Sequence, residues 1–152
     1  MKNFSIIIPI YNEAESIFEL INEIEVEFKP KVPEIIVVDD GSTDKVMKQL
    51  TDLKKDFLLV YRHKSNLGKC KAMETGIKKA KNNLICIMDG DGQNPPYEAK
   101  NLIKFTNKLN LKNKFLVCGN RKKRQDSFNK KISSRIANKI RKFILKDDCN
   151  DT

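Results

Sequence analysis

The sequence predicts one α/β domain in three layers, with helices on both faces of a mostly parallel sheet. Two observations predict it: five short apolar runs, and helical patterns that separate them. Compact runs rich in Ile, Val, Leu or Phe are typical of strands buried on both faces of a parallel sheet. The length of 152 residues and the hydrophobic content of 39 % suit a single domain over residues 1–152. The alternation of strand and helix implies right-handed crossovers.

The five runs are expected to form strands at Phe4–Ile10, Glu34–Asp39, Phe57–Arg62, Leu84–Met88 and Phe115–Cys118. A helix of about four turns is predicted between the first two runs, because apolar residues recur there every three or four positions, at Ile17, Leu20, Ile21, Ile24 and Phe28. The same spacing predicts helices over Thr43–Leu53 and Leu67–Lys81. Proline is tolerated in the first turn of a helix and not in its interior, so Pro95-Pro96 predicts a helix that begins there and runs towards Lys108.

The net charge of +10 resides in residues 121–146, which contain eleven basic residues and one acid. Ile132, Ile136 and Ile140 lie on one face of a helical pattern in this basic segment. The pattern predicts either a surface helix docked on the sheet or a helix at an anionic membrane surface. No apolar run is long enough for a transmembrane helix, and the N-terminus does not resemble a signal peptide. A cytoplasmic location is therefore expected.

Acidic residues follow two of the predicted strands, where parallel α/β sheets bind their ligands. Asp89-Gly90-Asp91 follows the fourth strand, and its two carboxylates suit Mg²⁺ or Mn²⁺ that bridges phosphate oxygens. Gln93 could add a neutral oxygen ligand. Asp39-Asp40 follows the second strand, and a carboxylate there could accept hydrogen bonds from a nucleobase or a ribose. The alternative for both motifs is an acidic turn that caps the next helix.

Four motifs resemble, in the same order, those of the family 2 glycosyltransferases. They are Ser5–Glu13, Val37–Asp44, Asn66–Lys69 and Met88–Pro96. The later residues Gly119-Asn120-Arg121 and Ser134-Arg135 are similar to the polyprenyl-phosphate branch, typified by dolichol-phosphate mannose synthases. The resemblance covers almost the whole chain. It implies a GT-A fold, a nucleotide-sugar donor (GDP-mannose or a UDP-sugar), a divalent metal and inversion at the anomeric carbon.

The resemblance also assigns roles to residues. Those matched to donor binding are Pro9, Tyr11, Glu13, Asp39, Asp40, Lys69, Asp89, Gly90, Asp91, Gln93 and Arg121. Those matched to catalysis are Asp89, Asp91, Arg121 and Asp151. The metal ligands would be Asp89, Asp91 and Gln93, and the acceptor phosphate would meet Arg121, Arg135 and Arg141.

The reaction implied is transfer of a sugar, with mannose expected, to a polyprenyl phosphate at the cytoplasmic face of the membrane, by a peripherally attached protein. A phosphate acceptor is already ionised at neutral pH, so a strong general base is unnecessary. This agrees with a chain whose one histidine, His63, is expected at the surface. Catalytic domains of this family are usually longer, which predicts a chain that lacks part of the acceptor side, retains donor binding and turns over poorly.

Two other functions remain open from the sequence. Met88–Gly92 also resembles the nucleophile loop of haloacid-dehalogenase-like phosphatases, with Asp89 as nucleophile and Asp91 as acid/base. That loop usually follows the first strand, whereas here it follows the fourth. A nucleic-acid-binding module could use residues 121–146 on phosphates. Only Phe128 and Phe143 are aromatic in that segment, so no nucleic-acid partner is expected.

Overall fold

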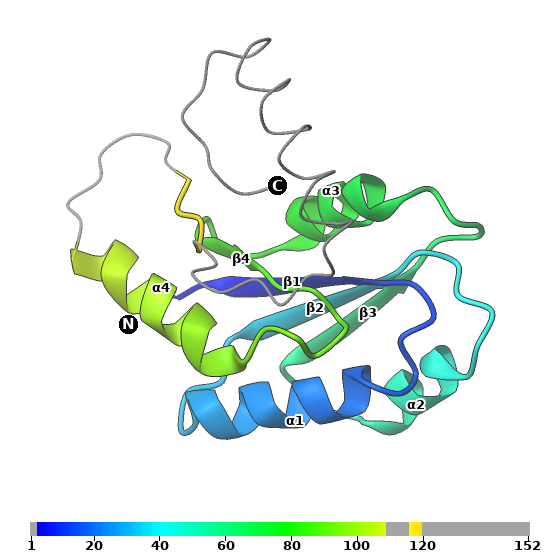
Figure 1. Cartoon of the computed structure of the whole chain (residues 1–152), viewed down its shortest axis with the longest axis horizontal. Helices are drawn as coiled ribbons and strands as arrows, with labels where there is room; N and C mark the ends of the chain where they lie inside the picture. Colours follow the sequence, from blue (N-terminus) through cyan, green and yellow to red (C-terminus); the bar gives the residue numbers. More distant parts are fainter. Residues whose placement is uncertain (1–2, 109–115, 120–152) are drawn as a thin grey trace, which may run out of the picture. The chain divides into compact units, whose positions relative to one another are not determined.

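The computed structural model describes residues 3–108 and 116–119 of the chain. Strands and helices alternate in the first of these stretches (Figure 1). They are β1 (Ser5–Ile10), α1 (Ile17–Phe28), β2 (Glu34–Asp39), α2 (Val46–Asp52), β3 (Leu58–Arg62), α3 (Lys69–Lys79), β4 (Ile85–Ile87) and α4 (Pro96–Lys108). The predicted alternation is confirmed for these eight elements.

The four strands form one sheet in the order β3-β2-β1-β4, and every neighbouring pair is parallel. Ile7 in β1 is paired with Ile36 in β2 and with Ile87 in β4. Because all strands run in one direction, their carboxyl ends meet at a single edge of the sheet. The loops that carry the acidic motifs start from that edge.

Side chains alternate between the two faces of the sheet, as the strand repeat requires. Ile6, Ile8 and Ile10 of β1 join the buried side chains of α1, α2 and α4 in one core. Ile7 lies on the opposite face, in a smaller core with Ala72 of α3. Figure 1 shows α3 on one side of the sheet and the other three helices on the other side. The predicted three-layer arrangement is confirmed.

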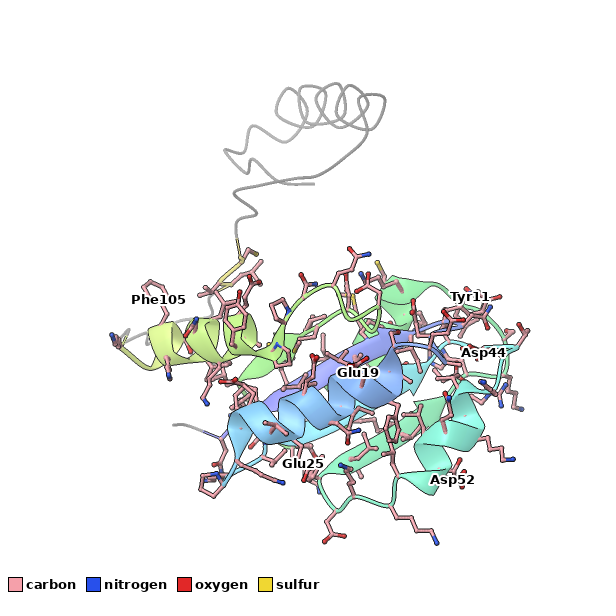
Figure 2. All side chains as sticks on the ribbon, turned by 60° about the horizontal axis from the view of Figure 1, so that its bottom comes forward. Tyr11, Glu19, Glu25, Asp44, Asp52 and Phe105 are labelled. Atoms are coloured by element: carbon pink, nitrogen blue, oxygen red, sulfur yellow. The ribbon has the colours of Figure 1, made fainter. Side chains whose placement is uncertain are left out.

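The apolar stripe predicted for α1 faces the larger core. Its buried members are Ile17, Leu20, Ile21, Ile24 and Phe28. Burying an aliphatic or aromatic side chain of this size contributes about 1.5–3 kcal/mol. The Phe28 ring packs against Phe4, with ring centroids 5.5 Å apart. Glu19 and Glu25 lie on the outer side of the same helix (Figure 2), so α1 is amphipathic in the predicted sense.

Two helices begin later than their periodicity predicts, because backbone N–H groups of the residues before them donate to side chains that are distant in the sequence. α2 begins at Val46 rather than at Thr43, whose backbone N–H donates to Asn12 Oδ1 at 2.8 Å. α3 begins at Lys69 rather than at Leu67, because the N–H groups of Leu67 and Gly68 donate to the Asp40 carboxylate.

The strand predicted at Phe115–Cys118 is wrong for the part that the structure describes. Residues 116–119 form neither helix nor strand, and Leu116 is 87 % exposed. A four-residue apolar run has a weak local preference, because a strand depends on the neighbour with which it pairs. Phe115 and the basic segment 121–146 lie outside the described residues, so the prediction of one domain over 1–152 stays a prediction. None of the helices in the described part of the chain has both the length and the apolar composition of a transmembrane span.

Candidate active site

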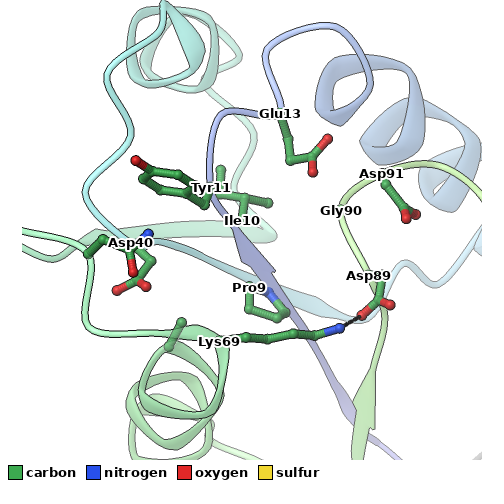
Figure 3. A pocket seen from close by; sticks show the side chains of 11 residues that line it. Pro9, Ile10, Tyr11, Glu13, Asp40, Lys69, Asp89, Gly90 and Asp91 are labelled. Carbon is green, nitrogen blue, oxygen red and sulfur yellow. Dashed lines mark ion pairs between the residues drawn. The ribbon is translucent and has the colours of Figure 1, made fainter. Parts of the chain in front are cut away.

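A pocket of about 220 Å³ opens where the carboxyl ends of β1, β2 and β4 meet the start of α3 (Figure 3). It is lined by Pro9, Ile10, Tyr11, Glu13, Asp40, Asn66, Lys69, Ala72, Asp89, Gly90 and Asp91. Figure 3 shows Asp40 and Tyr11 on one side of the pocket and Asp89 and Asp91 on the other. Segments far apart in the sequence therefore build one polar site at the carboxyl edge of the sheet.

Most of the residues expected to bind a donor line this pocket. They are Pro9, Tyr11, Glu13, Asp40, Lys69, Asp89, Gly90 and Asp91. Asp39 and Gln93 are not among the lining residues. Arg121, Arg135, Arg141 and Asp151 lie outside the described residues. Their roles in catalysis and acceptor binding, like the donor-binding roles, stay predictions.

The loop after β4 holds its two carboxylates at the pocket wall. Asp89 Oδ1 lies 2.6 Å from Lys69 Nζ, and Asp91 Oδ1 accepts the backbone N–H of Gln93 at 3.0 Å. A β-carbon at residue 90 would overlap the Ile10 side chain, so glycine allows this loop to pack over the end of β1. The loop thus places one carboxylate against a lysine and leaves the other in a tight turn.

The fit of a divalent metal depends on these two carboxylates. In the part of the chain that the structure describes, no three His, Cys, Asp or Glu side chains converge into a metal-binding group. Gln93 is exposed and lies outside the pocket lining. However, Mg²⁺ is commonly held by one or two carboxylates, with water and substrate phosphate oxygens as the other ligands. Asp89 and Asp91 fit a cation of this kind that arrives with a diphosphate.

Asp40 is an almost buried hydrogen-bond acceptor at the other side of the pocket, with a side chain only 4 % exposed. Its Oδ1 accepts the Leu67 N–H at 2.9 Å and lies 2.7 Å from His63 Nδ1, and its Oδ2 accepts the Gly68 N–H at 2.7 Å. Burial raises the pKa of Asp40, but the hydrogen bonds from Leu67, His63 and Gly68 outweigh it and bring the pKa below its usual value. The carboxylate is therefore ionised at neutral pH.

His63 does not lie at the surface, so that prediction is wrong. Its side chain is 12 % exposed and lies between Asp40 and Thr75, with Nε2 2.9 Å from Thr75 Oγ1. The loop after β3 folds back towards α3, and this long-range contact buries the ring. Its position directly after a strand was the one signal in the sequence, because residues there lie at the carboxyl edge of the sheet.

Asp39 supports the turn beside Asp40 and is fully buried. Its Oδ1 accepts the Ser42 N–H at 2.9 Å, and its Oδ2 lies 3.1 Å from Arg62 Nε. Gly41 has a φ of +76°, and a β-carbon there would lie 2.6 Å from the backbone of Ser65. Glycine therefore allows the loops after β2 and β3 to approach closely.

Asn12 was not assigned a role from the sequence, yet it joins two loops of the site. Its backbone N–H donates to Ser42 Oγ at 2.8 Å, and its φ is +58°. Together with the bond from Thr43 described above, this contact fixes the segment that carries Tyr11 and Glu13. Asn66 and Ala72 also line the pocket without having been predicted, because their orientation depends on where α3 lies against the sheet.

The parallel α/β sheet with its flanking helices is shared with solved glycosyltransferases of the GT-A fold. S. aureus TarS (residues 1–349) in complex with UDP-GlcNAc matches with a TM-score of 0.60 and 26 % identity, over 70 % of this chain and 32 % of TarS. The mannosyltransferase PcManGT from Pyrobaculum calidifontis, in complex with GDP-Man and Mn²⁺, matches with a TM-score of 0.53 and 27 % identity, over 59 % of this chain and 27 % of that protein. The chain therefore has the fold of the GT-A glycosyltransferases.

The family model "Glycosyl transferase family 2" matches residues 5–151, and the chain belongs to this family. Its relatives include undecaprenyl-phosphate 4-deoxy-4-formamido-L-arabinose transferases. The protein from Pectobacterium atrosepticum is 33 % identical over 144 residues, and that from Yersinia pestis is 35 % identical over 144 residues. Each match covers 91 % of this chain and 42 % of the relative. The predicted family is confirmed, and the chain spans less than half the length of these relatives.

Proposed function

We propose that this chain binds a nucleotide-sugar donor and takes part in transfer of the sugar to a polyprenyl phosphate, with inversion at the anomeric carbon. The observation that carries the proposal is the pocket with Asp40 on one side and Asp89 and Asp91 on the other. This separation suits a ligand with a hydrogen-bonding base at one end and a diphosphate at the other. The relatives named for undecaprenyl phosphate support the choice of acceptor class.

The base would be recognised by Asp40. An ionised carboxylate has about four acceptor positions, and three are taken by His63, Leu67 and Gly68. One position is left for a ligand N–H. Because an ionised carboxylate only accepts hydrogen bonds, it favours a base with a ring N–H, such as uracil or guanine, and Tyr11 offers an aromatic surface nearby.

The diphosphate would lie near Asp89 and Asp91, which would hold Mg²⁺ or Mn²⁺. Such a cation neutralises the negative charge that develops on the departing nucleoside diphosphate. Lys69 forms an ion pair with Asp89 and lines the same pocket, so its ammonium group would also contact a phosphate oxygen. The complex of PcManGT with GDP-Man and Mn²⁺ supports this assignment.

The acceptor phosphate would act as the nucleophile without a strong general base, because it is already ionised. His63, which binds Asp40 and does not line the pocket, is not needed as that base. We assign the acceptor phosphate to Arg121, Arg135 and Arg141, and we assign the basic segment 121–146 to the anionic cytoplasmic surface of a membrane. Asp151 is the remaining candidate for a base.

The donor sugar is proposed only as a class. The bacterial relatives are named for a deoxyformamido-arabinose, TarS was solved with UDP-GlcNAc and PcManGT with GDP-Man. Mannose therefore has no stronger support than the other sugars. Membership of family 2 favours this reaction class over the haloacid-dehalogenase-like phosphatase and the nucleic-acid-binding module.

The proposal is tested by calorimetry of the whole chain with GDP-mannose, UDP-glucose and UDP-GlcNAc, each with and without Mn²⁺. We expect one donor to bind in a metal-dependent way, and Asp91→Asn to weaken that binding by at least about tenfold. The matched control is Asp52→Asn, an exposed carboxylate at the end of α2, which should bind as the unmodified chain does. Absence of metal-dependent binding to all three donors would overturn the proposal.

A further inference from the structure

We infer that His63 is a positioning residue for base recognition, which holds the Asp40 carboxylate in the orientation that a nucleobase N–H requires. The inference rests on the proposed function, since it concerns the same pocket. It concerns a residue that does not touch the pocket and therefore acts only through Asp40.

The imidazole of His63 is fixed on both sides. Nδ1 lies 2.7 Å from Asp40 Oδ1, and Nε2 lies 2.9 Å from Thr75 Oγ1 in α3. The backbone N–H of His63 also donates to the carbonyl oxygen of Asp39 at 2.8 Å. The ring therefore has little freedom to turn, and it connects the end of β2 to the second turn of α3.

The hydrogen-bond partners of His63 determine which of its ring nitrogens carries the hydrogen. Asp40 is ionised and can only accept, so Nδ1 carries the hydrogen that is donated to Oδ1. In the neutral imidazole Nε2 then accepts from the Thr75 hydroxyl, and this second bond keeps the ring in the tautomer that serves Asp40. Thr75 thus supports the Asp40 carboxylate indirectly, because it binds His63, which in turn binds Asp40.

Without the imidazole, Oδ1 of Asp40 would keep one donor, the Leu67 N–H, and Oδ2 would keep the Gly68 N–H. A buried carboxylate is costly unless donors bind its oxygens. After loss of the imidazole, the Asp40 side chain would rotate to find another donor, or a water molecule would bind Oδ1. Either change alters the acceptor position left for the base. The expected consequence is weaker binding of the base, with the diphosphate side of the pocket unaffected.

The same helix supports both sides of the pocket. Lys69 in its first turn pairs with Asp89, and Thr75 one to two turns later holds His63. The two contacts are chemically independent, because one is an ion pair at the diphosphate side and the other is a hydrogen bond behind the base. A variant of His63 can therefore separate base binding from diphosphate binding.

The experiment compares UDP and GDP with pyrophosphate, which lacks the base, by calorimetry of the whole chain in the presence of Mg²⁺. For His63→Leu we expect about tenfold weaker binding of whichever nucleotide the unmodified chain binds, the loss of roughly one hydrogen bond to a buried charge. Pyrophosphate binding should not change. His63→Asn can still donate a hydrogen bond to Asp40 from its amide, so it should recover most of the nucleotide affinity.

Thr75→Val provides a second variant that leaves His63 and Asp40 intact and should weaken nucleotide binding less than His63→Leu. It keeps the test decisive if His63→Leu does not fold. Equal nucleotide affinity for the unmodified chain and for the variants would overturn the inference alone, and so would equal losses for nucleotide and pyrophosphate. If the unmodified chain binds neither nucleotide, the proposed function fails, and the inference falls with it.

Discussion

The two faces of the sheet differ in how they are covered and in what they do. One face packs against α1, α2 and α4 in a continuous core that contains Ile6, Ile8 and Ile10 of β1. The other face has, within the described residues, only α3, whose Ala72 meets Ile7 in a much smaller core. The pocket opens at the carboxyl edge of the sheet, beside the start of α3. Stability is therefore concentrated on the first face, whereas the geometry of the site depends on the placement of α3.

The largest effect on stability is expected from the well-covered face. Ile21→Ala, at a fully buried position of α1, should lower the free energy of unfolding by about 2–5 kcal/mol, because it removes buried apolar surface and leaves a cavity. Denaturant unfolding measures this change. Val26→Ala on the same helix, at a position 72 % exposed, should stay within about 0.5 kcal/mol of the unmodified chain. Equal losses at the two positions would remove the basis of the comparison.

Gly76→Ala tests the thinly covered face. A β-carbon at residue 76 would overlap the Ile7 side chain, so α3 must move away from β1. We expect a loss of about 1–3 kcal/mol from overpacking, larger than the gain of about 1 kcal/mol from helix propensity. Because α3 carries Lys69, nucleotide affinity should fall as well, which the Ile21→Ala variant should not cause below its unfolding transition.

A double-mutant cycle with Ile7→Ala separates this overlap from a general loss of helix stability. The loss in free energy of unfolding of the double variant should be smaller than the sum of the losses of the two single variants by at least about 0.5 kcal/mol. The reason is that Ile7→Ala removes the side-chain atoms with which the β-carbon of the new alanine would collide. Cys70→Ala, at an exposed position of α3, is the matched control. Additive effects of Gly76→Ala and Ile7→Ala would show that the close approach of α3 to β1 does not set the position of the helix.

A smaller effect is expected from Asp40, at the edge where the two faces end. Asp40→Asn should cost about 1 kcal/mol at neutral pH, because a neutral amide offers one acceptor oxygen to three donors. The pKa of Asp40 is lowered by folding, so its stabilisation is complete above the unfolded pKa of about 4 and disappears as the pH falls through the lower folded pKa. Urea unfolding of the unmodified chain and of Asp40→Asn, from pH 7 to pH 3, should show that the difference in their free energies of unfolding becomes smaller. A difference that grows on acidification would contradict this.

The smallest effect is expected on the outer side of α3. Glu74 forms ion pairs with Lys71 and Lys78, and these two lysines lower the pKa of Glu74 to about 2. All three side chains are largely in solvent, where such pairs are screened and contribute little. Glu74→Gln should leave the unfolding midpoint and nucleotide binding unchanged at neutral pH. A clear loss of either would show that the outer surface of α3 contributes to the site.

The same contrast explains how much could be predicted from the sequence. β1 was predicted almost to the residue, and the buried stripe of α1 was predicted in full, because their apolar patterns are long and serve one continuous core. The pocket could be predicted in outline, because the carboxyl ends of parallel strands meet at one edge, which places Asp40 and Asp89 in the lining of one pocket. Neither conclusion depends on contacts between distant loops.

The remaining features depend on such contacts and leave little local signal. The start of α3 is set by Asp40, which takes the N–H groups of Leu67 and Gly68 from 27 and 28 residues away. His63 is largely buried because its ring lies between Asp40 and Thr75, which are distant in the sequence. Asn12 joins two loops only through its hydrogen bonds with Ser42 and Thr43. The strand expected at Phe115–Cys118 shows the reverse case, in which an apolar run alone does not produce a strand.

The most direct test of the central claim is to map nucleotide binding on the assigned ¹H–¹⁵N spectrum of the chain, titrated with UDP or GDP and Mg²⁺. We expect shifts of backbone amide signals to cluster at and beside the pocket, at Tyr11, Asp40, Leu67–Lys69 and Asp89–Asp91, and to leave Ile21 and its neighbours in α1 unchanged. Shifts concentrated on α1 and α4, or the absence of any shifts at saturating nucleotide and Mg²⁺, would contradict the claim that the pocket beside α3 is the donor site.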